Sequence, residues 1–176
     1  MRHMPGYAIA AALLLLAIAR DAGATTRTVC ASGCGFTTIQ AAQNASAGGD
    51  TIDVRGPLTE QGIILDRTLI ILSSLPQAPV VQAATQSGVA TDRVFYIAPG
   101  VTVLMQNLRL RNGNFPSGAG GGIAAFGGLI LKNCTVSDCV ASSGGGIYAA
   151  GLLQLIETTV ERNHAFAHGG GILAQG

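Results

Sequence analysis

The chain has 176 residues, of which 48% are hydrophobic and only 11% are charged, and its formal net charge is +1. High apolarity with low charge argues against intrinsic disorder, and the lack of a basic excess argues against a nucleic-acid partner. The length allows one domain once a leader is removed.

Residues 1–24 have the features of a secretory signal peptide. Arg2 begins a short basic stretch, Ala8–Ala19 is an uninterrupted apolar run, and Ala22-Gly23-Ala24 supplies a small-x-small cleavage pattern. A membrane-spanning helix needs about 20 apolar residues, so this run is too short to span a bilayer, and an uncleaved anchor is the alternative. We therefore expect an exported protein, extracellular or on an outer-membrane surface, whose mature chain starts at or near Thr25. No transmembrane segment is expected in the mature region.

Four cysteines behind a signal peptide are candidates for disulfides. Cys30 and Cys34 flank a short turn-like stretch, and we favour their pairing. Cys134 and Cys139 pair with one another, or Cys134 is a buried free thiol. A four-cysteine metal site is the rival interpretation, but the second pair lacks the short spacing that such sites use.

Residues 36–45 predict the one helix of the mature chain. Thr37 followed by Gln40 has the spacing of a capping box, and Gly48-Gly49 would end the helix. The apolar positions at i, i+3 and i+6 are Ile39, Ala42 and Ala45. We expect residues 25–50 to form an N-terminal loop and this helix, which would cover the exposed edge of the first coil of the fold that follows.

Three copies of Gly-Gly-Gly-Ile begin at Gly120, Gly144 and Gly169. A nearly constant period of this size indicates stacked supersecondary units. Short alternating runs rich in Val, Leu, Ile and Thr fill each period and predict strands rather than helices. We therefore predict an all-β fold, a right-handed parallel β-helix over residues 51–176 with about 24 residues and three strands per coil. No cap follows the last triplet, so we expect truncation at the C-terminal end.

Superposing the runs predicts columns of like side chains that point into the core. The columns are Val103/Leu129/Leu153, Met105/Leu131/Leu155, Leu108/Cys134/Thr158, Leu110/Val136/Val160 and Ile123/Ile147/Ile172. Alternation skips at Asn107, Asn133 and Glu157, where we expect corners. The glycines are expected to turn with positive φ and to allow close backbone approach. The triplets also match a dinucleotide-binding fingerprint, which we reject because that motif needs a helix after it.

A polar ladder at one corner is a further hypothesis. Asn114, Asp138 and Asn163 each stand six residues before a glycine triplet, which predicts stacked side chains that bond the backbone. Superposing the strands instead aligns Gly113 and Cys139 with Asn163. The two alignments differ by one residue, and both stay open from the sequence.

Residues 36–72 resemble the opening of bacterial right-handed parallel β-helix proteins of the pectin lyase-like superfamily. The matching features are a TIQAA helix at Thr38–Ala42, a GDTI strand at Gly49–Ile52 and a G-x-x-x-E turn at Gly56–Glu60. Asn163-His164-Ala165 with the following GGGI is similar to the repeat of polymorphic outer-membrane proteins. The resemblance implies a bacterial, surface-exposed or secreted β-helix.

Enzymes of the resembled superfamily cut or eliminate acidic polysaccharides with clustered aspartates, and the lyases use Ca²⁺ and an arginine base. The weak catalytic candidates here are Asp138 and Glu161, which follow equivalent strands on neighbouring coils with Arg111 and Arg162 nearby. Two coils can supply the carboxylate separation of about 5 to 9.5 Å that glycosidases need. A solvated corner is the favoured interpretation of this pair. His164 is expected to lie with His168 in a loop as a polar surface residue.

We favour a surface protein without an evident catalytic site, adhesin-like or autotransporter-passenger-like, whose partners would be cell-surface glycans or proteins. The alternatives are a polysaccharide lyase or glycoside hydrolase with its active site beyond residue 176, and a purely structural solenoid. No cofactor is expected, and Ca²⁺ enters only with the lyase alternative.

Overall fold

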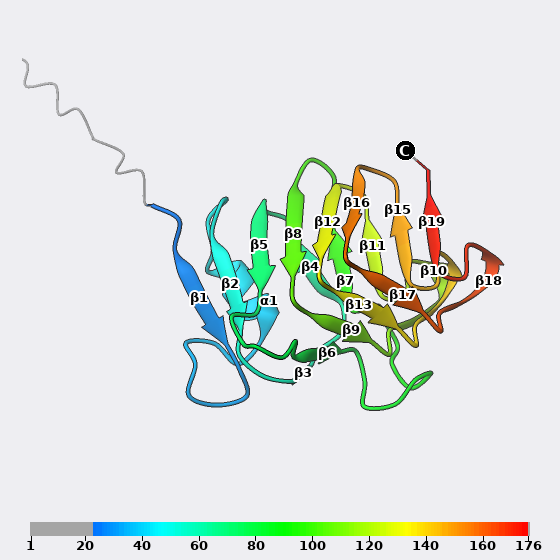
Figure 1. The fold of residues 1–176 in the computed structure, drawn as a ribbon. Coiled ribbons are helices and arrows are strands. Elements are labelled where there is room, and N and C mark those ends of the chain that lie inside the picture. Colours follow the sequence, from blue (N-terminus) through cyan, green and yellow to red (C-terminus); the bar gives the residue numbers. More distant parts are fainter. Residues whose placement is uncertain (1–22, 176) are drawn as a thin grey trace, which may run out of the picture.

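The computed structural model describes residues 23–175, which form a parallel β-solenoid of about six turns with about 25 residues per turn (Figure 1). The predicted parallel β-helix with one short helix is confirmed. The predicted signal peptide lies outside the described residues except for Gly23 and Ala24.

The strands stack into four sheets in which every pairing is parallel. The first sheet has the order β1 (Thr26–Val29), β2 (Thr51–Val54), β5 (Leu69–Leu72), β8 (Thr102–Gln106), β12 (Gly128–Lys132) and β16 (Leu153–Ile156). The second comprises β3 (Leu58–Thr59), β6 (Val80–Gln82), β9 (Arg109–Arg111), β13 (Thr135–Ser137) and β17 (Thr159–Glu161). The third comprises β4 (Ile63–Leu65), β7 (Phe95–Ile97), β11 (Ile123–Ala125), β15 (Ile147–Ala149) and β19 (Ile172–Ala174). The fourth comprises β10 (Asn114–Ala119), β14 (Val140–Ser143) and β18 (His164–His168).

The predicted columns are the side-chain ladders of the core. Leu129 pairs with Val103 on one side and with Leu153 on the other, and Val136 pairs in the same way with Leu110 and Val160. The members in the middle coils, such as Leu129 and Val136, are fully buried. Because parallel pairing stacks equivalent positions about 4.8 Å apart, a periodic sequence becomes a continuous apolar core.

The glycine triplets form one corner of the last three coils. The first glycine of each triplet has positive φ, between 60° and 69°. A Cβ at the second glycine of the first triplet, Gly121, would lie 2.4 Å from the carbonyl oxygen of Val140 on the next coil. The triplets therefore serve both expected purposes, a left-handed turn and close backbone approach. Strands β11, β15 and β19 follow them, not the helix that a dinucleotide site requires.

The other corners turn on non-glycine residues in the left-handed region. Asn107, Asn133 and Glu157, the predicted corner positions, have φ values of 57°, 51° and 48°. A second set of left-handed residues at equivalent positions comprises Asn112, Asp138 and Arg162. Asparagine and aspartate tolerate this conformation better than other non-glycine residues, which explains most of these identities.

Of the two alignments for the polar corner, the superposition of strands is correct. Asn114 pairs with Val140, and Val140 pairs with His164, so Asn163 stacks on Cys139. The Asn163 side chain accepts a hydrogen bond from the Cys139 backbone N–H and donates one to the Val136 carbonyl, both at 3.0 Å. The predicted Asn114/Asp138/Asn163 ladder is wrong. Asp138 stacks with Arg162, one position before Asn163, and Asn114 stacks with His164, one position after it.

The prediction missed one set of three strands and the first strand of the chain. The last three coils have a fourth strand, β10, β14 or β18, whose small, polar and aromatic sequences lack an alternating apolar pattern. His164 and His168 therefore lie on a strand and not in a loop. Strand β1 was expected to be a loop, yet it pairs in parallel with β2 and extends the first sheet.

Helix α1 (Ile39–Asn44) lies at the end of the solenoid that β1 and β2 form (Figure 1). Its N-cap is Thr38 and not Thr37: the Thr38 hydroxyl accepts a hydrogen bond from the Ala41 N–H at 3.2 Å. The second half of the cap comes from Glu60, whose carboxylate accepts from the N–H groups of Ile39 and Gln40 at 2.7 and 2.9 Å. A carboxylate at a helix N-terminus satisfies amides that the helix leaves free.

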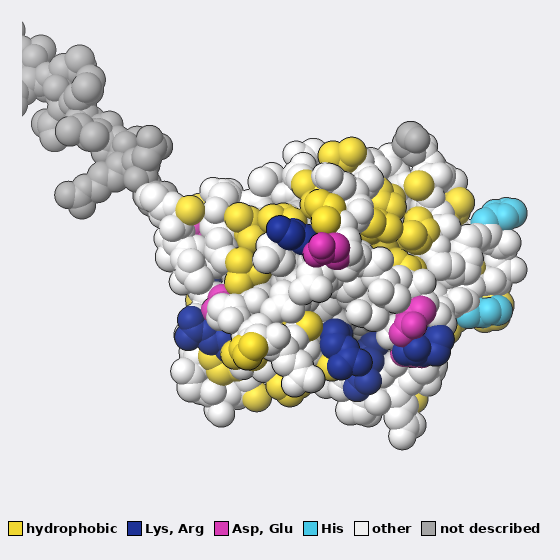
Figure 2. All heavy atoms as spheres, viewed as in Figure 1, with side chains coloured by type: hydrophobic (Ala, Val, Ile, Leu, Met, Phe, Trp, Pro, Cys, Tyr) yellow, Lys and Arg dark blue, Asp and Glu magenta, His cyan; other side chains and the backbone are white. Residues whose placement is uncertain are grey.

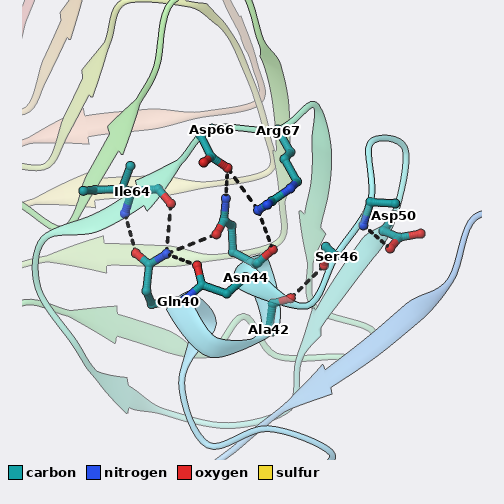
Figure 3. Close-up of polar contacts among 10 residues, drawn as sticks. Gln40, Ala42, Asn44, Ser46, Asp50, Ile64, Asp66 and Arg67 are labelled. Atoms are coloured by element: carbon teal, nitrogen blue, oxygen red, sulfur yellow. Dashed lines mark hydrogen bonds and ion pairs between the residues drawn. The ribbon is translucent and has the colours of Figure 1, made fainter.

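Gln40 joins this helix to the sheet below it. Its side-chain oxygen accepts from the Ile64 N–H at 2.7 Å, and its nitrogen donates to the Ile64 carbonyl at 3.2 Å (Figure 3). The amide group thus occupies the place of a neighbouring strand along β4. Ile39 and Ala42, on the inner face of the helix, are fully buried, so the helix closes this end of the core.

The four cysteines form one disulfide. Cys30 is bonded to Cys34, while Cys134 and Cys139 are free and buried. The possible pairing of Cys134 with Cys139 is not present, because strand β13 separates the two residues and each thiol donates to nearby carbonyl oxygens instead. Burial raises the pKa of both thiols, that of Cys139 to about 12, so neither is an activated nucleophile.

Candidate binding face

The outer face of the third sheet carries a column of apolar and aromatic side chains. Ile64, Tyr96, Ala124, Tyr148 and Leu173 occupy equivalent positions on β4, β7, β11, β15 and β19. Their neighbours in the first four of these strands, such as Phe95 and Ile97, are buried. Strand alternation therefore directs this column away from the core.

Three aromatic rings form a continuous row on this face. The ring centroids of Tyr96 and Phe126 are 5.4 Å apart, and those of Phe126 and Tyr148 are 5.5 Å apart. Phe126 follows β11 directly and takes the space that the small Ala124 leaves between the two tyrosines. Ala124 is fully buried although it faces outward, which we attribute to these rings, while Phe126 remains 38% exposed.

The row ends at a hollow that contains a buried guanidinium group. The hollow has a volume of about 260 Å³ and is lined by Gly62, Ile64, Asp92, Arg93, Tyr96 and Phe115. The Arg93 guanidinium carbon lies 4.1 Å from the ring centre of Phe115 and 5.7 Å from that of Tyr96. Both distances are within the range of cation–π contact, so the two aromatic side chains fix the position of the positive charge.

Arg93 is incompletely paired. Its side chain is only 12% exposed, and the nearest carboxylate contact places Nε 3.7 Å from Asp92. Within the described part of the chain, Nε has no hydrogen-bond acceptor. Burial lowers the pKa of Arg93, and the Asp92 charge partly opposes this. An arginine stays protonated in any case, so the hollow presents a cation with unused donor capacity.

The loop before β7 is held in place by hydrogen bonds to Gln61, which lies on the preceding coil. The Gln61 side chain accepts from the Thr91 and Asp92 backbone N–H groups at 3.0 and 3.2 Å. The Asp92 carboxylate accepts from the Arg93 N–H at 2.8 Å. The hollow is thus formed by ordered side chains and backbone. Such a face can stack on flat apolar surfaces and donate hydrogen bonds from one arginine.

The two carboxylates predicted as catalytic candidates come together around an arginine. Arg162 contacts both carboxylate oxygens of Asp138, at 2.8 and 3.1 Å, and one oxygen of Glu161 at 2.6 Å. The hydrogen bonds from Arg162 hold the pKa of Asp138 below its usual range. A general acid of a glycosidase needs a raised pKa, so the geometry describes an ion-pair cluster that joins two coils.

The remaining polar candidates lie apart from this cluster. The histidine side chains stand at the end of the molecule where β18 lies (Figure 2), and the His164 ring packs edge-on against Phe166 at 4.9 Å. Across residues 23–175, no group of three or more His, Cys, Asp or Glu side chains is arranged to hold a metal ion. The same residues include no helix long and apolar enough to cross a bilayer.

Sequence reasoning missed the aromatic row and the Arg93 hollow. Tyr96 and Tyr148 occupy the same outward position two coils apart, and aligning the strands in the sequence could have revealed this. The ring between them comes from Phe126, two positions beyond the column, so superposition alone does not place it there. Phe115 lies in β10, a strand that the apolar pattern did not predict.

Comparisons with protein families, with curated proteins and with solved structures found no match to this chain.

Proposed function

We propose that this protein is exported and acts as a surface-exposed binding solenoid, adhesin-like or autotransporter-passenger-like. The observation that carries the proposal is the row of Tyr96, Phe126 and Tyr148 that leads to the buried Arg93. Aromatic side chains with an exposed face and a fixed cation are typical of recognition surfaces.

The form of the row favours an extended ligand. Neighbouring coils are about 4.8 Å apart, so the rings follow one another along the solenoid axis at a spacing close to the length of one sugar residue. Sugar rings offer flat C–H faces for stacking and hydroxyl or carboxylate oxygens for Arg93. We therefore propose cell-surface glycans as the first partner class and proteins as the second.

The enzyme alternative, a polysaccharide lyase or hydrolase with its site beyond residue 176, rests on family resemblance. Asp138 and Glu161 do not add to it, because Arg162 pairs with both and the pKa of Asp138 is lowered. Ca²⁺ as a cofactor belongs to this alternative only. The binding role has the stronger physical support because its aromatic side chains reach the surface, with Phe126 exposed and Tyr96 and Tyr148 half-buried.

Tyrosine fluorescence offers a direct test. The chain has no tryptophan, and the tyrosines after residue 24 are Tyr96 and Tyr148, both in the aromatic row. Soluble neutral and uronic-acid-containing hexasaccharides would be titrated into residues 25–176. We expect at least one probe to change the fluorescence in a saturable way, and Phe126→Ala to weaken its binding about fivefold or more, by analogy with the stacking of a nucleobase on an aromatic side chain, which contributes about 1–3 kcal/mol.

Phe166→Ala is the matched control, because Phe166 is an exposed aromatic residue on β18, outside the row. Its binding should equal that of the wild type. Equal losses in both variants would contradict the assignment of the face. No response to any oligosaccharide, together with capture of a surface protein through the row, would move the proposal to the second partner class.

A further inference from the structure

A residue near the predicted cleavage point contacts a buried carboxylate. The backbone N–H of Thr25 donates to Asp50 Oδ1 at 2.7 Å. Asp50 precedes β2 and is only 3% exposed. The Thr25 carbonyl accepts from the Thr51 N–H at 2.9 Å, so Thr25 is held in register before β1 begins.

Asp50 has two other donors. Arg27 Nη1 lies 2.5 Å from Asp50 Oδ2, and the Ala47 N–H donates to the same oxygen at 2.7 Å. Figure 3 shows the Asp50 carboxylate folded back on the chain that leaves α1. The hydrogen bonds from the Thr25 and Ala47 amides and the Arg27 charge hold the pKa of Asp50 below its usual range, so it is ionised at neutral pH.

The same point in the chain is where the leader sequence predicts cleavage. The pattern Ala22-Gly23-Ala24 places the peptide bond to be cut between Ala24 and Thr25. Residues 23–26 are exposed, whereas residues 27–30 are partly or fully covered. The bond is therefore accessible, and the nitrogen that its cleavage would release is the atom already bound to Asp50.

We propose that cleavage after Ala24 turns this contact into an ion pair between the Thr25 α-ammonium group and Asp50, so that the mature chain completes the first coil. The inference rests on the export proposed above. In the reaction, water adds to the Ala24 carbonyl carbon, the C–N bond breaks, and the released nitrogen gains protons to become –NH₃⁺. One amide donor is replaced by three donors and a full positive charge.

The ion pair has a defined charged neighbourhood. The titratable and charged groups on the elements packed around it are Arg27, Asp53, Arg55, Glu60, Asp66 and Arg67. Of these, Arg27 is the one bonded to Asp50; Asp53 pairs with Arg55 and Asp66 with Arg67, while Glu60 caps α1. Among these charged groups, the α-ammonium group therefore shares the Asp50 carboxylate with Arg27, while the Ala47 N–H is its uncharged donor.

The titration of the α-amino group is the test. After reductive ¹³C-methylation, residues 25–176 carry two labelled amines, the α-amine and Lys132, because Lys132 is the single lysine of the chain. An ordinary α-amine has a pKa of about 7.7–8.0, and an opposite charge at this distance raises it by about 1 or more. We expect a higher α-amine pKa in the wild type than in Asp50→Asn, and the Lys132 signal serves to identify the second label, because Lys132 lies on β12.

A second comparison keeps Asp50 intact, in case Asp50→Asn does not fold. A chain that begins at Ala24 has its α-amine one residue too early. The Thr25 chain should unfold at a higher temperature than the Ala24 chain below about pH 8. A raised folded-state pKa stabilises below the unfolded pKa and loses this contribution as the pH rises through the folded value, so the difference should disappear in alkali.

The same α-amine pKa in the wild type and in Asp50→Asn, or equal stability of the Thr25 and Ala24 chains at pH 6, would overturn the inference. These experiments use purified chains with defined starts and do not depend on export. N-terminal sequencing of protein released from cells tests export separately, and an intact Met1 there would overturn the proposed processing.

Discussion

Equivalent residues in neighbouring coils differ in burial, and the difference depends on what lies above them. Leu131 and Leu155 share one ladder, yet Leu131 is fully buried and Leu155 is 37% exposed. Leu131 has a coil on each side, whereas Leu155 belongs to β16, the last strand of its sheet among the described residues. Burial in this fold therefore comes from the neighbouring coil as much as from the residue itself.

The opposite end of the solenoid is covered. Helix α1 buries Ile39 and Ala42, Glu60 caps the helix, and Gln40 occupies the edge of β4 (Figure 3). Among the described residues, the strands of the last coil, β16 to β19, each pair on one side only. A covered end thus needs residues of a different kind from the ladder residues, and the chain supplies them before the first complete coil.

The largest expected effect comes from placing a charge at two points of one ladder. Val136→Asp would bury an unpaired carboxylate among Leu110, Val160 and the rest of the core, and we expect a loss of several kcal/mol in the free energy of unfolding. Val160→Asp lies in the last described coil, where water reaches the site, so its cost should be about 1 kcal/mol. Urea unfolding of both variants measures the difference. Equal losses would show that the last coil is covered.

A smaller effect is expected at the covered end. Glu60→Ala leaves the Ile39 and Gln40 N–H groups without their carboxylate acceptor, and we expect it to cost about 1–2 kcal/mol. Glu157→Ala is the matched control, because Glu157 is an exposed glutamate at a corner of the last coil. Thermal unfolding of the two variants would distinguish them, and an unchanged transition in Glu60→Ala would mean that the cap contributes no stability.

The smallest effect concerns the ion-pair cluster that joins the last two coils. Arg162 lowers the pKa of Asp138, so Asp138 stabilises the folded state above its unfolded pKa of about 3.9, and this contribution is lost as the pH falls through the lower folded value. Asp138→Asn should therefore be less stable than the wild type at pH 6 and should converge with it in acid. A stability difference that stays constant down to pH 2 would contradict the pairing with Arg162.

The periodic part of this fold could be predicted from the sequence because each coil repeats the same physical requirements. The columns that contain Leu129 and Val136, the turns at Asn107 and Asn133 and the glycine corners all follow from one period. The fold class follows from the same period. The position of the helix over the first coil could be predicted because an exposed strand edge needs a cover.

The features that the sequence did not predict depend on single long-range contacts. Glu60 caps a helix 20 or more residues earlier, and Phe126 fills a gap that Ala124 leaves in the tyrosine column. Thr38 rather than Thr37 became the N-cap because Thr38 precedes the residue whose side chain reaches the core, Ile39. Asp50 likewise binds the backbone N–H of Thr25, which is close in space but 25 residues away in the chain.

Hydrogen exchange of individual backbone amides in residues 25–176 is the most direct test of the central claim, that each coil is protected by its neighbours. Within residues 23–175, strands β12 and β13 are paired on both sides, whereas β16 and β17 are paired on one side. We predict slow exchange in β12, in β13 and in β4 beneath α1, and much faster exchange in β16 and β17 of the monomer. Protection of β16 and β17 equal to that of β12 and β13 would contradict the account.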